Sequence, residues 1–482
     1  MGLGHELKRL ARHSAIYGIG GLVSRVLAVL LLPLYTHYLS DADYGRIETL
    51  VAASTVLVIV LRMGISSAFF RFYFDSTDPE RRTLVVRTSF WFTMAMATLG
   101  LVLGVVLAPQ IADALNLGGH SANLVRAAAV GLWAQMNYEQ LTSLFRVEER
   151  SVQFVFASLA NILITVAATV ILVVGFHKGP LGVLVGNFLG TLCVYVVLLA
   201  YRRYQLGFQF DGRLLRAMNR FGMPLVPSAL ALWAINFIDR FFVGQFKGQA
   251  EVGVYSVAVR ISSAVVFLLI AFRTAWPAFA YSIEDDREAK RTYAFVLTYL
   301  VVVACWASLA LGALAPWIVD ALTAPRFHRA HEAVALLAFA AAAYAGYTVL
   351  AIGSGRARRT QLNWVITGIA AAVNVGLNVA LIPPYGMIGA AIATAASYVT
   401  LFAGMVVYAQ RVYPVAYQWR RVLTAAAVAV GLTVAARATG APLAVSLVLV
   451  VVYPLALLPL GFYLPAERKR LAHLRERFQV LG

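Results

Sequence analysis

The sequence predicts an all-α polytopic membrane protein of about 14 transmembrane helices. These are expected to form two pseudo-symmetric six-helix lobes plus two C-terminal helices around a central cavity. Three observations predict this fold: an apolar composition, apolar runs of transmembrane length and an internal repeat. Of the 482 residues, 61% are hydrophobic and only 13% are charged. Soluble chains carry about 25% charged residues, whereas membrane helices need about 20 apolar residues each.

Fourteen apolar runs define the expected helices in chain order. The first follows the basic start "MGLGHELKRLARH" and is too long for the apolar region of a signal peptide, so we expect it to be retained as a helix. The thirteenth is the weakest. The expected spans are 14–37, 44–71, 84–108, 120–145, 151–175, 179–202, 218–245, 251–280, 292–315, 331–354, 361–383, 387–410, 420–437 and 441–463.

The distribution of Lys and Arg predicts the orientation. With the N-terminus inside, 27 of the 40 basic residues fall in cytoplasmic segments and 5 in external loops. By the positive-inside rule, this asymmetry predicts an even number of spans and two cytoplasmic termini. The same rule accounts for the net charge of +18, so we expect no nucleic-acid partner.

Three short matches at nearly one offset predict an internal repeat. "DADYGRIETL" resembles "QAEVGVYSVA", with Gly45 over Gly253 at an offset of 208. "ERSVQF" (149–154) resembles "ARRTQL" (357–362) at 208, and "GPLG" (179–182) resembles "GMIG" (386–389) at 207. An offset of six spans preserves orientation, as in parallel transporter repeats.

The repeat predicts the domain organisation. Each lobe holds six spans, a basic linker joins the lobes, and the last two spans precede a basic cytoplasmic tail. The expected boundaries are 1–202 for the first lobe, 203–217 for the linker, 218–410 for the second lobe, 411–463 for spans 13 and 14, and 464–482 for the tail.

Charged residues inside the expected spans mark the candidate site, because an Arg near the bilayer centre costs roughly 2.5–3.5 kcal/mol on insertion scales. They gather in spans 1, 2, 7 and 8. The Arg residues outnumber the interior acids, with Glu139 placed nearer a span end, which indicates a cationic cavity for an anionic ligand such as phosphate. The expected ligand contacts are Arg25, Arg62, Arg240, Arg260 and Arg273.

Asp239 and Glu48 are the candidate ion or charge-relay residues within these spans. Asp239 is expected either to orient Arg240 or to form a coupling-ion site. The alternative is an ion pair that only holds helices together, since intramembrane charges usually pair.

A Pro-rich segment, "FGMPLVPS", lies near the inner end of span 7. Because Pro removes a backbone donor and kinks a helix, Gly222, Pro224 and Pro227 are the candidate hinge. A fixed kink is the alternative.

Enzymatic motifs are sparse. The longest external segments, 109–119 and 316–330, are short for a polymerase or ligase, and no Lys is followed by Ser or Thr as a Walker A motif requires. His328 and His331 form an HxxH without further ligands nearby. We therefore expect no enzyme activity, cofactor or metal. A lipid-binding scaffold without transport remains an alternative.

The segment 363–398 resembles the oligosaccharide flippase (polysaccharide transporter) family of the multidrug/oligosaccharidyl-lipid/polysaccharide exporter superfamily. Segments 14–50 and 238–261 resemble the same family. The residues that carry the first resemblance are Asn374, Asn378, Leu381, Ile382, Pro383, Tyr385, Gly386, Gly389, Ala390 and Ala391.

The resemblance implies a cavity bounded by spans 1, 2, 7 and 8. It also implies outward transfer of a polyprenyl-diphosphate-linked oligosaccharide across a bacterial cytoplasmic membrane, for cell-surface polysaccharide synthesis. The implied partners are that glycan lipid, membrane lipids and a polysaccharide polymerase or another biosynthesis protein. A lipid II flippase and a multidrug or metabolite antiporter of the same superfamily remain alternatives.

Overall fold

The computed structural model describes residues 29–119 and 121–465, and all regular structure within them is helical. Nine helices in this part of the chain are long and apolar enough to cross a membrane. The all-α multi-pass fold class is therefore confirmed, and fourteen spans are consistent with these helices. The first expected span lies mostly outside the described residues, which include only its end as α2 (Leu32–Tyr38).

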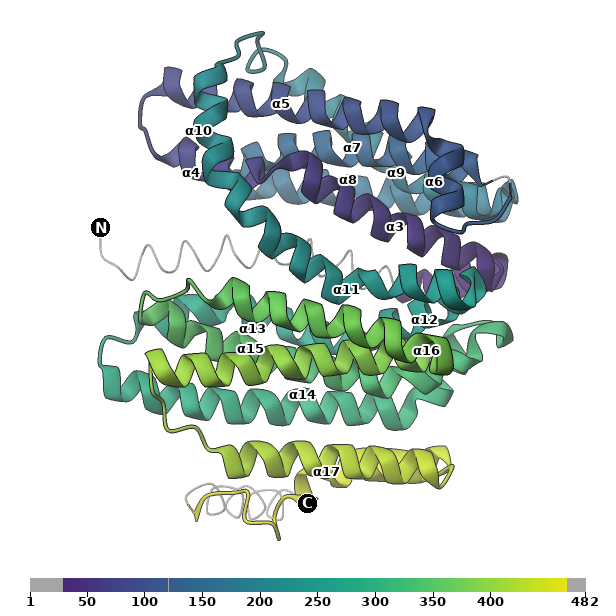
Figure 1. The fold of residues 1–482 in the computed structure, drawn as a ribbon, viewed down its shortest axis with the longest axis vertical. Helices are drawn as coiled ribbons and strands as arrows, with labels where there is room; N and C mark the ends of the chain where they lie inside the picture. The colour runs from purple at the N-terminus through teal and green to yellow at the C-terminus, as the bar shows by residue number, and fades with distance from the viewer. Residues whose placement is uncertain (1–28, 120, 466–482) are drawn as a thin grey trace, which may run out of the picture.

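Figure 1 shows two groups of roughly parallel helices, one above the other. We call the upper one the first group. Its helices are α3 (Asp41–Arg62), α4 (Ile65–Phe74), α5 (Pro79–Val106), α6 (Ala108–Ala114), α7 (Ala122–Val147), α8 (Ser151–Val170), with a π-helical end at Ile171–Gly175, and α9 (Gly179–Arg202).

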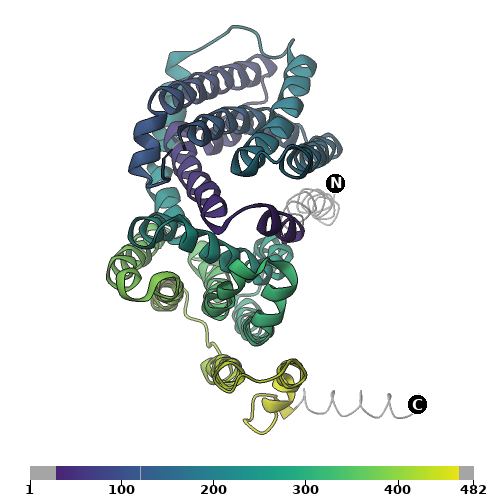
Figure 2. The same cartoon turned by 90° about the vertical axis from the view of Figure 1, so that its right-hand side faces the viewer.

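The second group lies below and begins after a connecting helix, α10 (Gly212–Gly222), and a 3₁₀ turn at Met223–Leu225. Two further helices, α17 (Trp419–Ala438) and α18 (Leu443–Ala456), follow it at the far edge of the molecule (Figure 2). The second group consists of α11 (Val226–Lys247), α12 (Gln249–Ser262), α13 (Ala264–Ser282), α14 (Asp286–Leu322), a 3₁₀ helix at Pro325–Ala330, α15 (His331–Arg356) and α16 (Asn363–Val412).

The 50-residue α16 is two antiparallel helices joined by a tight turn. Gly386 lies at the turn with φ 55° and ψ −132°, outside helical geometry, after Pro383 and Pro384. The Nδ2 of Asn374 donates a hydrogen bond to Ser397 Oγ at 3.4 Å. In a straight helix these residues would be about 35 Å apart. The two expected spans 361–383 and 387–410 therefore correspond to the two arms of α16.

Two other expected spans are broken. Span 2 is α3 followed by α4, because Met63 and Gly64 both take left-handed backbone at φ 48° and 74° and end α3. Span 8 is α12 followed by α13, with the interruption at Ser263.

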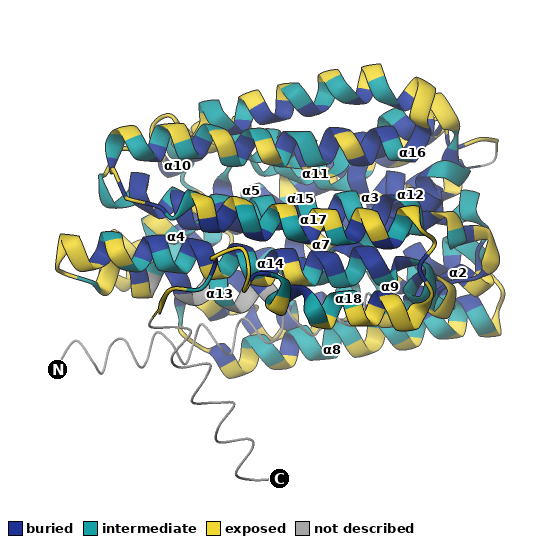
Figure 3. Ribbon diagram, turned by 90° about the horizontal axis from the view of Figure 1, so that it is seen from below, coloured by how far each residue is buried: buried dark blue, intermediate teal, exposed yellow. Residues whose placement is uncertain are grey.

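Side-chain burial follows the packing of the helices. The dark blue, buried faces point inward and exposed residues cover the outside, as expected for helices surrounded by lipid (Figure 3).

The two groups are in contact where α3 crosses α11 and α12. Gly45 of α3 and Gly253 of α12 lie at the closest approach, and a Cβ on Gly45 would overlap the Gln249 carbonyl oxygen. A Cβ on Gly253 would overlap the carbonyl of Asp41. Small residues permit such close backbone contact between membrane helices. The two glycines that are aligned in the predicted repeat therefore lie at a contact between the two helix groups.

Replacing Gly45 tests this contact. We expect Gly45→Ala to force α3 and α12 apart and to destabilise the protein by about 1–3 kcal/mol, the usual cost of overpacking. Thermal unfolding in detergent would measure the change. The matched control is Gly376→Ala on α16, where an added Cβ meets no atom within 4 Å. Equal stability of both variants would contradict the close contact.

Candidate functional site

Helix α3 carries the first residue of the site. Ser40 caps the helix, since its Oγ accepts a hydrogen bond from the Asp43 backbone N–H at 3.0 Å. Glu48 follows two turns later on the face toward α11 and α12, and it is only 8% exposed. A buried carboxylate inside an apolar bundle requires a cationic partner.

The tight connection between α11 and α12 supplies the partners. Gly248 ends α11 with φ 85°, a left-handed conformation that favours glycine, and α12 begins at the next residue. The chain therefore turns back, and Tyr255 of α12 donates a hydrogen bond to Asp239 of α11. Arg240 and Arg260 lie on the same side as this pair, facing Glu48.

Four charged residues form a cluster between the two helix groups: Glu48, Asp239, Arg240 and Arg260. Glu48 pairs with Arg260 at 2.6 Å and with Arg240 at 3.7 Å. Arg240 also pairs with Asp239 at 3.2 Å. Because Glu48 belongs to the first group and both Arg residues to the second, the two ion pairs of Glu48 join the groups. The formal charges of the four residues sum to zero.

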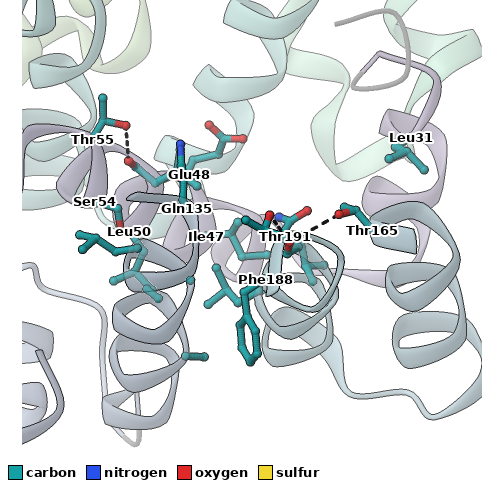
Figure 4. Close-up of a pocket in the computed structure, with 18 of the residues that line it drawn as sticks. Leu31, Ile47, Glu48, Leu50, Ser54, Thr55, Gln135, Thr165, Phe188 and Thr191 are labelled. Atoms are coloured by element: carbon teal, nitrogen blue, oxygen red, sulfur yellow. Dashed lines mark hydrogen bonds between the residues drawn. The ribbon is translucent and has the colours of Figure 1, made fainter. Parts of the chain in front are cut away.

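Arg260 differs from the rest of the charge cluster because its side chain is 24% exposed, against 5% for Arg240 and 3% for Asp239. It reaches a cavity of about 500 Å³ surrounded by α2, α3, α7, α8 and α9. Among the described residues that line this cavity, Arg260 alone comes from the second group. Figure 4 shows Glu48, Gln135, Thr165, Thr191 and Phe188 around it. The cavity therefore offers a ligand one guanidinium, held by one carboxylate.

Arg62 lies apart from the charge cluster. It is 14 residues after Glu48, about 21 Å along the helix axis, and pairs with Glu139 of α7 at 2.7 Å. Gln135 Nε2 donates to the same carboxylate at 2.9 Å. The structure thus does not bring Arg62 together with Arg240 and Arg260. This pairing is not predicted from the sequence, in which Glu139 lies nearer the end of the expected span 120–145.

The other two candidate Arg residues have different surroundings. Arg273 is exposed on α13 with its guanidinium 5.0 Å from the Tyr344 ring centre, and within the described chain no carboxylate pairs with it. Arg25 lies outside the described residues. The sequence predicts a surplus of Arg over acids inside the membrane. The structure corrects this for three of the five candidate residues, because Arg62, Arg240 and Arg260 each have an acid partner.

The candidate hinge residues lie at a break between helices. Pro224 is within the 3₁₀ turn, and Pro227 is in the first turn of α11. Gly222 contacts the backbone of Gly64, so closely that a Cβ on either would overlap the other residue. Two interrupted helices thus cross at their interruptions.

Sequence reasoning missed several residues of the site. Tyr255 was not selected, although it is fully buried against Asp239 and lies near Thr394 of α16. Tyr44, on whose ring Arg260 lies at 5.5 Å, was also missed. Because tyrosines are common in any membrane bundle, the sequence gives no reason to select Tyr44 or Tyr255. Only the fold shows that they lie beside charged residues.

The fold and the paired charges define a class: a polytopic membrane protein in which two helix groups meet at a buried charge cluster. A family model described as "Polysaccharide biosynthesis protein" matches residues 36–332. The chain belongs to this family. The resemblance to oligosaccharide flippases is thereby confirmed, although the segment 363–398 lies outside the matched residues.

Two curated proteins are similar in sequence. An uncharacterized membrane protein of Haemophilus influenzae is 24% identical over 280 residues, 55% of this chain and 64% of that protein. The succinoglycan biosynthesis transport protein ExoT of Rhizobium meliloti is 24% identical over 286 residues, 58% of this chain and 55% of ExoT. The similarity thus spans less than two thirds of either relative.

Solved structures share the fold at low sequence identity. The lipid II flippase MurJ in an inward closed conformation superposes with a TM-score of 0.72 at 12% identity, covering 92% of this chain and 97% of MurJ. An inward-facing multidrug resistance MATE transporter gives 0.62 at 14% identity, covering 81% of this chain and 97% of the transporter. The chain therefore has the same fold as these solved membrane proteins and belongs to a polysaccharide biosynthesis family.

A double-mutant cycle tests the ion pair between the groups. We expect Glu48→Gln and Arg260→Gln to show a coupling of about 0.5–3 kcal/mol in the free energy of unfolding, because the two residues share one buried contact. Denaturation in detergent micelles would measure it. The control cycle uses Asp43 and Arg46, a more exposed pair on α3 that should give at most about 0.5 kcal/mol. Equal coupling in both cycles would contradict a special role for Glu48.

Proposed function

We propose that this protein is a flippase, not an enzyme, that moves a polyprenyl-diphosphate-linked oligosaccharide from the cytoplasmic to the external leaflet of a bacterial inner membrane. One observation carries the proposal: Arg260 faces the cavity while its partner Glu48 belongs to the opposite helix group. The family and the similarity to ExoT support a glycan as the cargo.

Competition for Arg260 would couple binding to movement. Each phosphate of a diphosphate can accept two parallel hydrogen bonds from a guanidinium, as one carboxylate can. A diphosphate that enters the cavity offers two such groups and displaces the Glu48 carboxylate from Arg260. The ion pair that joins the groups is then replaced by a contact between ligand and Arg260. Loss of this pair lowers the cost of separating α3 from α12, which is the step that opens the opposite side in alternating access.

The two helix groups act as the two lobes, with the connecting segment belonging to the first, and both termini lie in the cytoplasm. Gly222, Pro224 and Pro227 act as the hinge, because they take up the change in backbone angles where α10 meets α11 when the lobes rotate. Asp239 fixes the position of Arg240 through its ion pair. Arg25 and Arg273 stay candidate diphosphate contacts.

A lipid II flippase is the second candidate function. The similarity to MurJ in fold favours it, but 12% identity shows the fold alone. An antiporter for cationic drugs would need an acidic cavity. Here the one acid of the charge cluster that lines the cavity, Glu48, is already paired with Arg260, which weighs against that alternative.

Reconstituted transport tests the proposal. Proteoliposomes would receive a polyprenyl diphosphate carrying a fluorescent sugar, and an impermeant quencher would report the fraction in the outer leaflet. We expect Arg260→Gln to slow transfer at least tenfold, which corresponds to about 1.4 kcal/mol in the activation free energy, whereas Arg291→Gln on an exposed turn of α14 should leave the rate unchanged. Transfer no faster than in protein-free liposomes would refute the function.

Membrane potential should accelerate the same transfer. Each negative charge moving outward across an inside-negative membrane gains about 2.3 kcal/mol per 100 mV. Because the charge cluster has no net charge, the loaded diphosphate provides the charge that moves in this part of the protein. We expect a faster rate under a potassium diffusion potential that is negative inside. An unchanged rate at both signs of the potential would contradict movement of a charged diphosphate.

A further inference from the structure

Part of the cavity lining consists of uncharged polar side chains from three consecutive helices of the first group, α7, α8 and α9. We call this surface the amide–hydroxyl wall, and its residues are Gln135, Asn161, Thr165, Asn187 and Thr191. Apolar residues, including Phe188, lie between them. The proposed diphosphate contact at Arg260 leaves this wall unused.

Helix packing explains part of the wall but not all of it. Asn161 Oδ1 accepts hydrogen bonds from Thr165 and Thr191, both at 3.3 Å, and thereby links α8 to α9. In contrast, the side-chain amide of Asn187 is exposed to the cavity and makes no hydrogen bond to any other described residue. Gln135 is also exposed there. The Asn187 amide thus offers donors and an acceptor that no other described residue uses, whereas Gln135 donates from Nε2 to Glu139 of its own helix and offers its remaining N–H and its Oε1.

The internal repeat provides a control within the same chain. At the offset of 208, Gln135 corresponds to Ala343 and Asn161 to Ile369. Thr165 likewise corresponds to Val373. In the predicted repeat, the second group therefore carries apolar residues at these three positions, whereas Asn187 and Thr191, at the offset of 207 that applies to α9, correspond to Thr394 and Tyr398. Polar groups inside a membrane are costly unless they are satisfied. The contact of Asn161 with Thr165 and Thr191 accounts for part of the contrast, and a ligand accounts for the polarity of Gln135.

The chemistry of the wall selects the class of ligand. Amides and hydroxyls both donate and accept, as sugar hydroxyls do, and the Phe188 ring supplies an apolar surface for the CH face of a sugar ring. Among the described residues, Arg260 is the one cation that lines the cavity, so a second anionic group would find no further cationic partner among them. The volume of about 500 Å³ is within the 300–1,000 Å³ usual for small-ligand sites.

We propose that the amide–hydroxyl wall binds an uncharged sugar residue of the glycan, next to a diphosphate held at Arg260. The proposal rests on the flippase function above and adds a subsite that recognises the sugar itself. Gln135 and Asn187 make the direct hydrogen bonds, Asn161 holds α8 against α9, and Phe188 forms the apolar floor. Selection of an uncharged sugar is thus separated in space from recognition of the diphosphate.

Three lipid probes test this subsite by native mass spectrometry of the full-length protein. The probes are polyprenyl diphosphate alone, the same lipid carrying N-acetylglucosamine, and the same lipid carrying glucuronic acid. We expect the wild type to bind the N-acetylglucosamine lipid at least tenfold more tightly than the other two. Asn187→Leu and Gln135→Leu should each remove most of this preference while leaving binding of the bare lipid unchanged.

Controls separate this subsite from the function on which it rests. Asn123→Leu, at an exposed position of α7 outside the cavity lining, should keep the preference, and Asn187→Gln should restore part of it. Arg260→Gln should weaken all three probes together. Equal binding of the three probes by the wild type, or tighter binding of the glucuronic acid lipid, would overturn the subsite but leave the flippase proposal standing. Binding of none of them would overturn both.

Discussion

The arrangement of the molecule depends on one buried carboxylate, Glu48. It is shared by Arg260 at 2.6 Å and Arg240 at 3.7 Å, both on the opposite helix group. Removal of a single partner from such a set leaves an uncompensated charge in a medium of low dielectric, which is costly. In the proposed mechanism, this pair is exchanged when a stronger anion reaches the partly exposed Arg260.

The backbone around Glu48 makes this exchange consequential. Gly45 and Gly253 let α3 and α12 approach one turn away from the carboxylate, and Thr49 donates a hydrogen bond to Gln249 at 2.9 Å in the same region. At the other end of α3, Gly64 crosses Gly222 where both helices are interrupted. A rigid helix held at one end and interrupted at the other is suited to rotation about the interruption.

The two helix groups share an architecture but use it differently. The first group lines the large cavity with amides and hydroxyls, whereas the smaller cavity of about 130 Å³ in the second group contains Asp239, Tyr255 and Tyr398. If the predicted repeat reflects a duplication, contacts between helices are expected to be retained in both copies, because they decide whether each bundle folds. Side chains that face a cavity do not have this constraint and can acquire a binding role in one copy alone.

The sequence by itself determined the class of fold, because runs of about 20 apolar residues and the positive-inside distribution follow from the bilayer as solvent. It also aligned Gly45 with Gly253 in the predicted repeat and assigned interior charges to spans 2, 7 and 8. Only the tertiary structure decided which charges meet. Glu48 and Arg260 are 212 residues apart, and the pairing of Arg62 with Glu139 depends on how α3 packs on α7. Interhelical contacts of this kind leave no local periodicity in the chain, so the balance of charge in the cavity could be established only after the helices were placed.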